Sequence, residues 1–221
     1  MCDKNPQKIK DMFDNIASYY DKMNNLMSFY LHKKIKTKAV KMLDIKPKSY
    51  VLDLCCGTGD LCGIISDFQR KIRIIGVDNS LNMLKIAKSK YPNLTFIQGD
   101  CTNLPFDDEF DYVTISFGLR NIENRKLALT QIYKSLKTGG MILHLDFGKH
   151  NFLNKIFDKI LPFLVKILKK DEKSYEYLLK SKNTYPEPSE LIKEFEKSGF
   201  KFVKQKDFLF GAISAQVMKK Y

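Results

Sequence analysis

Long apolar runs are missing from this 221-residue sequence, since none approaches the roughly 18 residues that a membrane-spanning helix requires. The first ten residues are mostly polar, so we expect no secretory signal peptide. Internal repeats and low-complexity linkers are absent as well. We therefore expect a single domain over residues 1–221, long enough to bury a full hydrophobic core.

Cysteine is scarce, and its spacing does not suit the sites that depend on it. The five cysteines are at positions 2, 55, 56, 62 and 101, and no pair has the C-x-x-C spacing of zinc and redox sites. We expect neither a disulfide framework nor a metal site. A reduced, cytoplasmic compartment suits such a chain.

Acidic residues are few relative to basic ones. The chain has 38 Lys and Arg against 25 Asp and Glu, which gives a formal net charge of +13. A charge of this size favours an anionic partner, either a nucleic acid or a membrane surface. Lysine-rich coding from an AT-rich genome also raises the net charge. The excess of basic residues therefore does not by itself show that the protein has an anionic partner.

A glycine-containing turn follows the first predicted strand. Residues 51–55 form a short apolar run, as expected of a strand that is buried on both faces. Gly57 and Gly59 then interrupt it, and glycine lets a ligand lie against the backbone because it has no Cβ. Apolar residues at helical spacing follow in residues 61–68. Strand, turn and helix together predict the first unit of a nucleotide-type site.

The turn lacks the features that bind phosphate. A dinucleotide fingerprint needs a third glycine where this chain has Cys62, and the Gly-Lys-Ser/Thr of a P-loop is absent. Carboxylates are present instead, at Asp53, Asp60, Asp78 and Asp100. S-adenosylmethionine has no phosphate and carries a sulfonium and an ammonium, so carboxylates suit it. Asp78 comes 19 residues after Gly59, where it can hold the ribose hydroxyls. The alternative is an α/β domain with Asp at ordinary loop positions.

Strand and helix patterns alternate along the remaining core. Further predicted strands cover residues 72–78, 94–98, 110–117 and 141–146. Helices are expected at residues 80–90, 124–136 and 187–198. Residues 137–140 are predicted to form a helix cap and a turn. An antiparallel pair of strands is expected at the C-terminal end, at 200–206 and 209–218. This order predicts a Rossmann-like α/β fold, with a seven-stranded, mostly parallel sheet and helices on both faces.

The single domain has four predicted parts. Two helices within residues 6–43 precede the first strand, so we expect residues 1–45 to form a helical cover over the cofactor and the substrate pocket. Residues 46–150 are expected to form a cofactor-binding core, and residues 151–185 a helical insertion. Residues 186–221 are expected to form a C-terminal helix with a strand pair.

The segment 151–170 has a character of its own. Its apolar residues form one broad helical face, and lysines occupy the rest, at positions 155, 159, 166, 169 and 170. That pattern is typical of an interfacial helix on an anionic membrane, and we expect Pro162 to kink or split it. The alternative is that the apolar face packs on the sheet or on the partner in a homodimer.

Several motifs resemble those of the ubiquinone/menaquinone biosynthesis C-methyltransferase family. The N-terminal segment 13–21 with Asn24, the turn 54–60 and the segment 114–121, which reads Thr-Ile-Ser-Phe-Gly-Leu-Arg-Asn, carry the resemblance. Similar motifs are present at 174–178 and 211–213, so the likeness covers essentially the whole chain. There are departures from the family pattern. Gln216 replaces a His that is frequent in the last strand, and Asp100 replaces an Asn. The Gly that commonly precedes an early His is replaced near Tyr30, although His32 itself is present.

The resemblance implies a class I methyltransferase fold and S-adenosylmethionine as the cofactor. It also implies methyl transfer to a ring carbon of a prenylated quinol. Together with the turn and the acidic positions, it predicts cofactor contacts at Asp53, Gly57, Thr58, Gly59, Asp78, Asn79, Asp100, Cys101 and Ser116. Because the chain has no predicted targeting segment, we favour demethylmenaquinol as the substrate over a ubiquinone-pathway benzoquinol.

The chemistry requires a group that stabilises a phenolate and a group that accepts the phenolic proton. Arg120, just past the fourth predicted strand, suits the first role, and Asn121 can orient the quinol oxygen. Tyr20 comes from the helical cover and can close the site. His32 is a candidate proton acceptor, although a lone His is more often a packed residue. We expect His144 and His150 to be structural.

Two other functions remain open. A nucleic-acid methyltransferase would suit the positive charge, but the Asn/Asp-Pro-Pro-Tyr/Phe motif of base amino-methylation is missing after the fourth strand, where the chain reads Ser-Phe-Gly-Leu over 116–119. We therefore expect no nucleic-acid partner. A non-enzymatic subunit of a quinone pathway is a second alternative, which the complete cofactor turn disfavours.

Overall fold

A seven-stranded sheet forms the centre of the computed structural model, which describes residues 3–28, 30–149, 151–167 and 172–221. The spatial order is β3-β2-β1-β4-β5-β7-β6. The strands are β1 (Tyr50–Leu54), β2 (Arg73–Asp78), β3 (Thr95–Gln98), β4 (Phe110–Ser116), β5 (Leu136–Phe147), β6 (Lys201–Phe208) and β7 (Ile213–Lys219). The first five pair in parallel, and β7 runs antiparallel between β5 and β6. The predicted mostly parallel sheet is confirmed.

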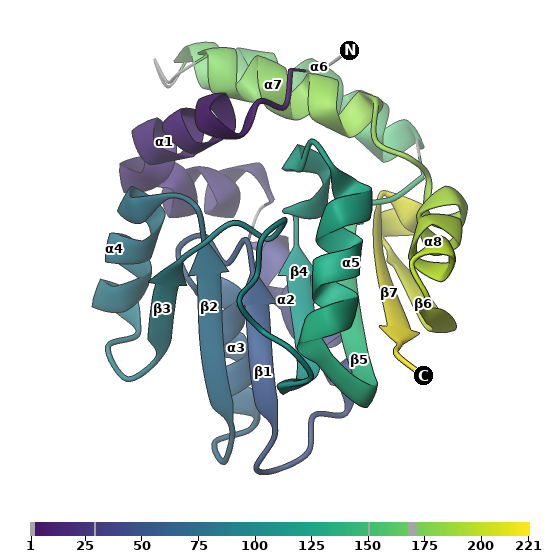
Figure 1. Ribbon diagram of the computed structural model, residues 1–221. Coiled ribbons are helices and arrows are strands. Elements are labelled where there is room, and N and C mark those ends of the chain that lie inside the picture. Colours follow the sequence, from purple (N-terminus) through teal and green to yellow (C-terminus); the bar gives the residue numbers. More distant parts are fainter. Residues whose placement is uncertain (1–2, 29, 150, 168–171) are drawn as a thin grey trace.

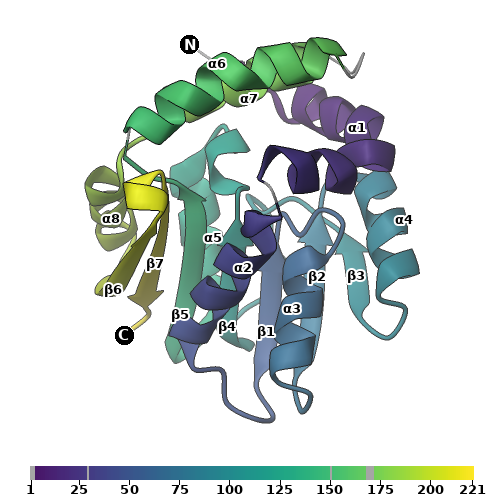
Figure 2. The same cartoon turned by 180° about the vertical axis from the view of Figure 1, so that it is seen from behind.

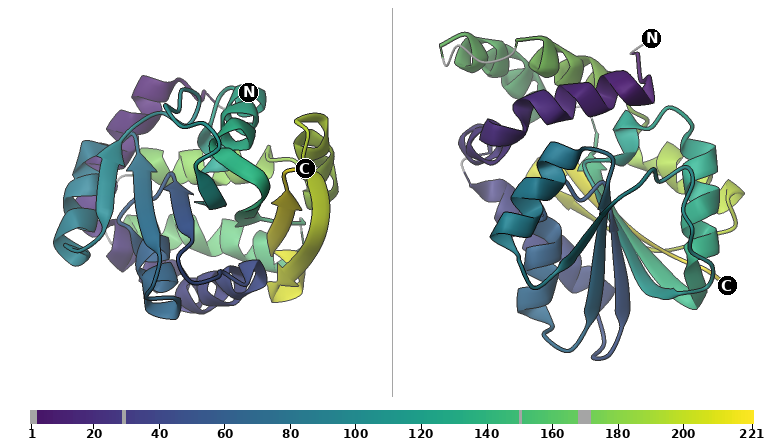
Figure 3. Two further views of the ribbon diagram at one scale, coloured as in Figure 1. Left: turned by 60° about the horizontal axis from the view of Figure 1, so that its bottom comes forward. Right: turned by 60° about the vertical axis from the view of Figure 1, so that its left-hand side comes forward.

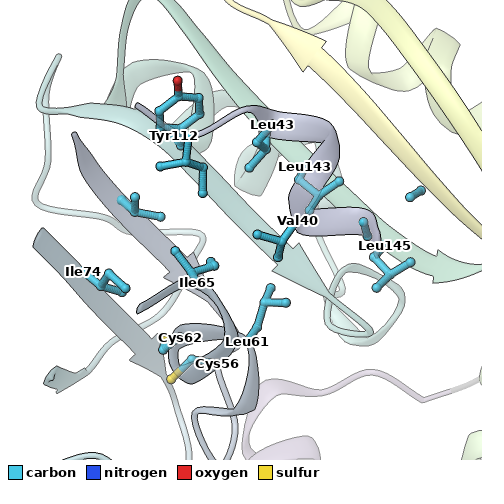
Figure 4. Packing of buried hydrophobic residues seen from close by; sticks show 14 of the residues in the cluster. Val40, Leu43, Cys56, Leu61, Cys62, Ile65, Ile74, Tyr112, Leu143 and Leu145 are labelled. Atoms are coloured by element: carbon cyan, nitrogen blue, oxygen red, sulfur yellow. The ribbon is translucent and has the colours of Figure 1, made fainter. Parts of the chain in front are cut away.

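Helices cover both faces of this sheet (Figures 1 and 2). On one face, residues of α2 (Leu31–Val40), α3 (Asp60–Phe68) and α4 (Leu81–Lys90) join a single apolar cluster. Figure 4 shows its centre, where Val40, Leu61 and Leu143 come together from α2, α3 and β5. The other face carries α5 (Arg125–Ser135) and α8 (Pro188–Lys197), which pack in a second cluster. β1 is buried on both sides, as its continuous apolar run predicts.

A further layer of helices lies across the carboxyl ends of the parallel strands (Figures 1 and 3). It contains α1 (Pro6–Met27), α6 (Phe152–Ile167) and α7 (Glu172–Asn183). Asn5 caps α1 by accepting hydrogen bonds from the N–H groups of residues 7 and 8. Met23 of α1, Leu161 of α6 and Tyr175 of α7 pack together. The N-terminal cover therefore consists of α1, whereas α2 mainly packs on the sheet.

Two local predictions are wrong, and a third is wrong in part. Residues 137–140 are part of β5, because the two glycines accommodate an irregularity in its pairing with β4, where the register shifts between Phe110 and Tyr112. Residues 209–211 form the short turn η3 (Leu209–Gly211) and not a strand, since Phe210 has φ 55°. The helix α6 continues through Pro162 and is not split. Within the described ranges, no helix has the length and hydropathy to cross a bilayer.

Candidate active site

The turn after β1 has a left-handed backbone at three positions. Cys55, Gly57 and Gly59 have φ angles of 53°, 55° and 79°. A Cβ at Gly57 would meet nothing within 4 Å, so this glycine faces open space. At Gly59 a Cβ would come within 3.0 Å of Phe96 and 3.1 Å of Ala87. The positive φ favours glycine at both positions, and close packing also excludes a side chain at Gly59.

Asp78, the last residue of β2, holds this turn in place. Its Oδ2 accepts a hydrogen bond from the Gly57 N–H at 2.8 Å, and its Oδ1 accepts one from the Ser80 N–H at 2.9 Å. Burial raises the pKa of Asp78 even though both backbone N–H groups favour the ionised form. Each oxygen keeps a lone pair with which it can accept a hydrogen bond from a hydroxyl group.

A cavity of about 220 Å³ opens beside Asp78. Six of the nine predicted cofactor contacts line it: Gly57, Asp78, Asn79, Asp100, Cys101 and Ser116. The side of α1 that contains Ile9, Phe13 and Tyr20 closes it. The helix α1 therefore covers this cavity, and it packs on α4 through Ile16 and Ala17.

The other three predicted cofactor contacts lie elsewhere. Gly59 is behind the turn, and the Thr58 hydroxyl donates to Asp21 at 2.6 Å and borders a second cavity. Asp53 lines neither cavity and is 1% exposed. It accepts hydrogen bonds from Thr114 at 2.6 Å and from the Cys62 thiol at 3.1 Å. The structure thus assigns Asp53 to the core, since a side chain within a parallel strand points into a helix-covered face.

Burial raises the pKa of Asp53 from 3.8 to about 6, although hydrogen bonds from Thr114 and Cys62 oppose the shift. The folded state therefore binds a proton that the unfolded state has already lost between about pH 4 and pH 6. The contribution of Asp53 to the free energy of unfolding is therefore fully present below about pH 4 and is lost as the pH rises to about 6. We expect Asp53→Asn to be more stable than the wild type above pH 6, by up to about 3 kcal/mol.

Chemical unfolding at several pH values measures this effect, and Asp67→Asn, an exposed site on α3, is the matched control. A difference in unfolding free energy between Asp53→Asn and wild type that stays constant from pH 4 to pH 6.5 would show that Asp53 does not titrate in this window.

The second cavity, of about 390 Å³, adjoins the first. Both are lined by Phe13, Tyr20, Cys55, Gly57, Ser116 and Phe117. Its remaining walls come from α1, α2, α6, α7 and η3, and they are mainly apolar. A group held in one cavity can therefore meet a group held in the other at the ends of β1 and β4. Phe117, with φ 56°, and Cys55 have a strained backbone at this boundary.

Arg120 borders the second cavity from η2 (Leu119–Asn121) and is 6% exposed. Its Nη1 donates to Asp146 Oδ1 at 3.0 Å and to the Phe117 carbonyl at 2.6 Å. The guanidinium lies 5.3 Å from the ring centre of Phe147. Its Nε, Asp146 Oδ2 and Ser116 Oγ are buried and have no hydrogen-bond partner among the residues that the structure describes. A buried cation with an unused donor is fixed in place and can bind an anionic oxygen.

Hydrogen bonds define the tautomer of His32. Ser28 Oγ lies 2.6 Å from the Asn24 carbonyl, to which it donates, and 2.6 Å from His32 Nδ1. Because the hydroxyl has one proton, Nδ1–H must donate to Ser28, so in the neutral imidazole the lone pair is on Nε2. His32 borders the second cavity, and its Nε2 is 3.8 Å from Asp60 Oδ2. An imidazolium formed at His32 would be stabilised by that carboxylate.

Asp60 also belongs to a network that the sequence did not reveal. Burial raises the pKa of Asp60, but His32, Lys36 and Lys90 outweigh it and hold the carboxyl well below its usual range. Lys90 Nζ is 2.5 Å from Asp60 Oδ1 and 2.7 Å from Asp21 Oδ2. Lys36 is 4.0 Å from Asp60, and burial lowers its pKa. These four charges fix α1, α2, α3 and α4 around one wall of the cavity.

The other predicted catalytic residues also lie at the cavities. Tyr20 is at the boundary, and burial raises the pKa of its phenol, which therefore stays protonated. Asn121 lines the first cavity, and its Oδ1 accepts a hydrogen bond from Tyr177 of α7 at 3.2 Å. His144 is buried in β5, between Gln216 at 2.6 Å and Tyr185 at 3.0 Å, as expected of a structural residue. His150 lies outside the described residues.

Comparison with solved structures confirms the class I methyltransferase fold. An S-adenosylmethionine-dependent methyltransferase of Thermotoga maritima superimposes with a TM-score of 0.71 and 21% identity, over 96% of this chain and 99% of its own. An S-adenosylmethionine-dependent methyltransferase of Aquifex aeolicus gives a TM-score of 0.63 and 14% identity, over 84% and 89%.

Comparison of sequences is more specific. A demethylmenaquinone methyltransferase of Staphylococcus carnosus (strain TM300) is 38% identical over 216 residues, which cover 93% of this chain and 90% of that protein. One from Bacillus cereus (strain AH187) is 34% identical over 230 residues, with coverage of 97% and 96%. The family model described as ubiE/COQ5 methyltransferase matches residues 1–220. This chain belongs to the ubiE/COQ5 methyltransferase family.

Proposed function

We propose that this protein transfers the methyl group of S-adenosylmethionine to a ring carbon of a prenylated quinol, with demethylmenaquinol as the substrate. The observation that carries the proposal is the shared wall between two adjoining cavities with different polar residues. The first contains Asp78, Asn79 and Asp100, and the second is bordered by Arg120 and His32. The names of relatives at 34–38% identity support the choice of quinol.

The residues of the first cavity suit S-adenosylmethionine. Space is open beyond Gly57, the Asp78 carboxylate can accept from both ribose hydroxyls, and the buried Ser116 Oγ has no partner within the described protein. When bound, this cofactor supplies an electrophilic methyl group on a sulfonium. Tyr20 and Phe13 cover the boundary from α1 and exclude water from it.

The residues of the second cavity suit a prenylated quinol. An aromatic carbon becomes a strong nucleophile when the neighbouring hydroxyl loses its proton. The sulfur–methyl bond would break as the new carbon–carbon bond forms, and the ring carbon would then lose its hydrogen as a proton to restore the aromatic quinol. His32 Nε2 accepts that proton, and Asp60 stabilises the resulting imidazolium. The guanidinium of Arg120 stabilises the phenolate oxygen, and Tyr20 donates to it from the boundary between the cavities. Asn121, which lines the first cavity, helps to orient the ring by holding Tyr177 in the wall of the second. The apolar side chains of α1, α6 and α7 accommodate the prenyl chain.

Asp78→Ala is expected to weaken S-adenosylmethionine binding by about 1–3 kcal/mol, because charge-assisted hydrogen bonds to the ribose are lost. Titration calorimetry on the purified protein measures the affinity. Asp67→Ala, an exposed carboxylate on α3, is the matched control and should bind as wild type does. Wild-type affinity in a folded Asp78→Ala protein would refute the assignment of Asp78.

Mass spectrometry of quinones from cells with and without this protein tests the proposed reaction. Loss of the protein should replace a ring-methylated naphthoquinone by its demethyl form. Accumulation of a demethylated benzoquinone would support the ubiquinone-pathway alternative. An unchanged quinone profile, together with a salt-dependent mobility shift on RNA or DNA, would favour a nucleic-acid methyltransferase. A changed profile without S-adenosylmethionine binding would favour a non-enzymatic subunit.

The substrate class also implies a place of action. A prenylated quinol resides in the bilayer, and the net charge of +13 favours anionic lipid. We therefore propose that the protein acts peripherally on an anionic membrane surface. A homodimer that buries part of the helical insertion stays a prediction and is the competing explanation for the apolar residues of that segment.

A further inference from the structure

The outer side of α6 and the neighbouring turn η3 expose large apolar side chains. Phe152, Ile156 and Ile160 are 58%, 46% and 49% exposed, and their spacing of four residues places them in one row along the helix. Phe210 of η3 is 84% exposed, and its ring centre lies 6.1 Å from that of Phe152. These four residues with Leu209 are called the outer apolar surface.

The fold does not need the outer apolar surface, because the opposite side of α6 already makes its internal contacts. Leu153 and Phe157 line the second cavity, and Leu161 packs against Met23 and Tyr175. A helix that is apolar on two sides has a second apolar neighbour. Packing on the protein and contact with a membrane are therefore compatible, because different sides of α6 can make them.

The turn η3 is strained in a way that presents Phe210 to the outside. Leu209 and Phe210 are consecutive non-glycine residues with φ angles of 51° and 55°. Asn151 at the start of α6 ties the turn down, since its Nδ2 donates to the carbonyls of Leu209 and Phe210 at 3.2 and 2.9 Å. Strained backbone of this kind persists at functional sites, where the surroundings hold it in place.

Positive charge borders the outer apolar surface. Lys155 and Lys159 are exposed on α6, and Lys149 is exposed just before it. Asp158, the acidic residue of this helix, is paired with the buried Lys182 at 2.8 Å, so it does not offset those lysines. Lys169 and Lys170, which were predicted to lie on the basic side of this helix, are outside the described residues. Exposed apolar side chains flanked by exposed lysines match an anionic lipid surface, which offers both an apolar layer and negative charge.

The surface is also continuous with the second cavity. Leu209 belongs to both, and Leu153 and Phe157 line the cavity from the inner side of α6. We propose that the outer apolar surface docks on an anionic bilayer and that the prenyl chain passes beside η3 from the membrane into the second cavity. This inference rests on the proposed function, since it needs a lipid-anchored substrate.

Vesicle co-sedimentation of the full-length protein tests the docking step. Wild type is expected to bind vesicles of phosphatidylcholine with phosphatidylglycerol, to bind pure phosphatidylcholine weakly, and to be released by salt. Ile156→Ser with Phe210→Ser should weaken binding roughly tenfold or more, since two large apolar side chains no longer enter the lipid. Phe202→Ser, 43% exposed on the edge strand β6, is the matched control and should bind as wild type does.

Methylation assays with two substrates separate this inference from the proposed function. The Ile156→Ser, Phe210→Ser protein should methylate a soluble short-chain quinol at the wild-type rate and a vesicle-bound long-chain quinol at least several-fold more slowly. Wild-type methylation of soluble quinol with no vesicle binding would overturn the docking surface alone. Vesicle binding without methylation of any quinol would overturn the function. A dimer that dissociates in the double variant, with vesicle binding unchanged, would assign the surface to a second copy.

Discussion

Arg120→Ala is expected to lower kcat for ring methylation by roughly 10²–10³-fold, the effect of losing one donor to a developing oxyanion. Affinity for S-adenosylmethionine should change little, because Arg120 borders the second cavity and not the first. Single-turnover methylation of a short-chain demethylmenaquinol measures the rate, with cofactor binding measured in parallel.

The ion pair with Asp146 complicates this variant. Removing one partner of a buried pair costs roughly 3–5 kcal/mol, because the other charge is left uncompensated. Arg120→Lys keeps the charge and should fold, yet it should restore the rate only in part, since an ammonium does not reproduce the planar guanidinium. Asp146→Asn removes the charge of the partner while it leaves Arg120 in place, so it tests the structural role of the ion pair separately. If folded Arg120→Ala or Arg120→Lys methylates at the wild-type rate, Arg120 is a structural residue.

His32→Ala is expected to lower kcat by roughly 10²–10⁴-fold, the range for losing a positioned general base. Added imidazole should restore part of the rate by taking the proton in place of the missing side chain. A packing defect would not respond to imidazole, so the rescue separates the catalytic role from a structural one.

Ser28→Ala is the control for His32 orientation. It removes the hydroxyl that holds Nδ1–H, and it should reduce kcat less than loss of the ring does, because Asp60 remains near Nε2. A His32→Ala protein that is as active as wild type, or inactive but unaffected by imidazole, would transfer the base role to another group. Lys36 is the first alternative, since it borders the same cavity and burial lowers its pKa.

Features that depend on neighbours in sequence were predictable. The glycine turn, the strand before it and the placement of Asp78 follow from local patterns, because parallel strands bring their carboxyl ends to one edge. For the same reason Gly57, Asn79, Asp100, Cys101 and Ser116 line one cavity with Asp78. The strand periodicity could not show that the Asp53 side chain points away from that edge into the core.

Features that depend on long-range packing were not predictable. Asp146 is an ordinary acidic residue at the end of β5 until the fold places it 3.0 Å from Arg120. Lys90 reaches Asp21 and Asp60 from another helix, across 69 and 30 residues of sequence. The two apolar sides of α6 looked like one broad face, because a helical pattern does not say where its neighbours lie.

Transfer of labelled methyl from S-adenosylmethionine to a short-chain demethylnaphthoquinol tests the central claim most directly. The purified protein, its Arg120→Ala variant and a parallel reaction with a benzoquinol are analysed by mass spectrometry. We predict label on the ring carbon next to a hydroxyl, faster transfer to the naphthoquinol than to the benzoquinol, and a large loss of rate in the variant. A folded, cofactor-binding wild-type protein that puts no label on the ring of either quinol would contradict the account.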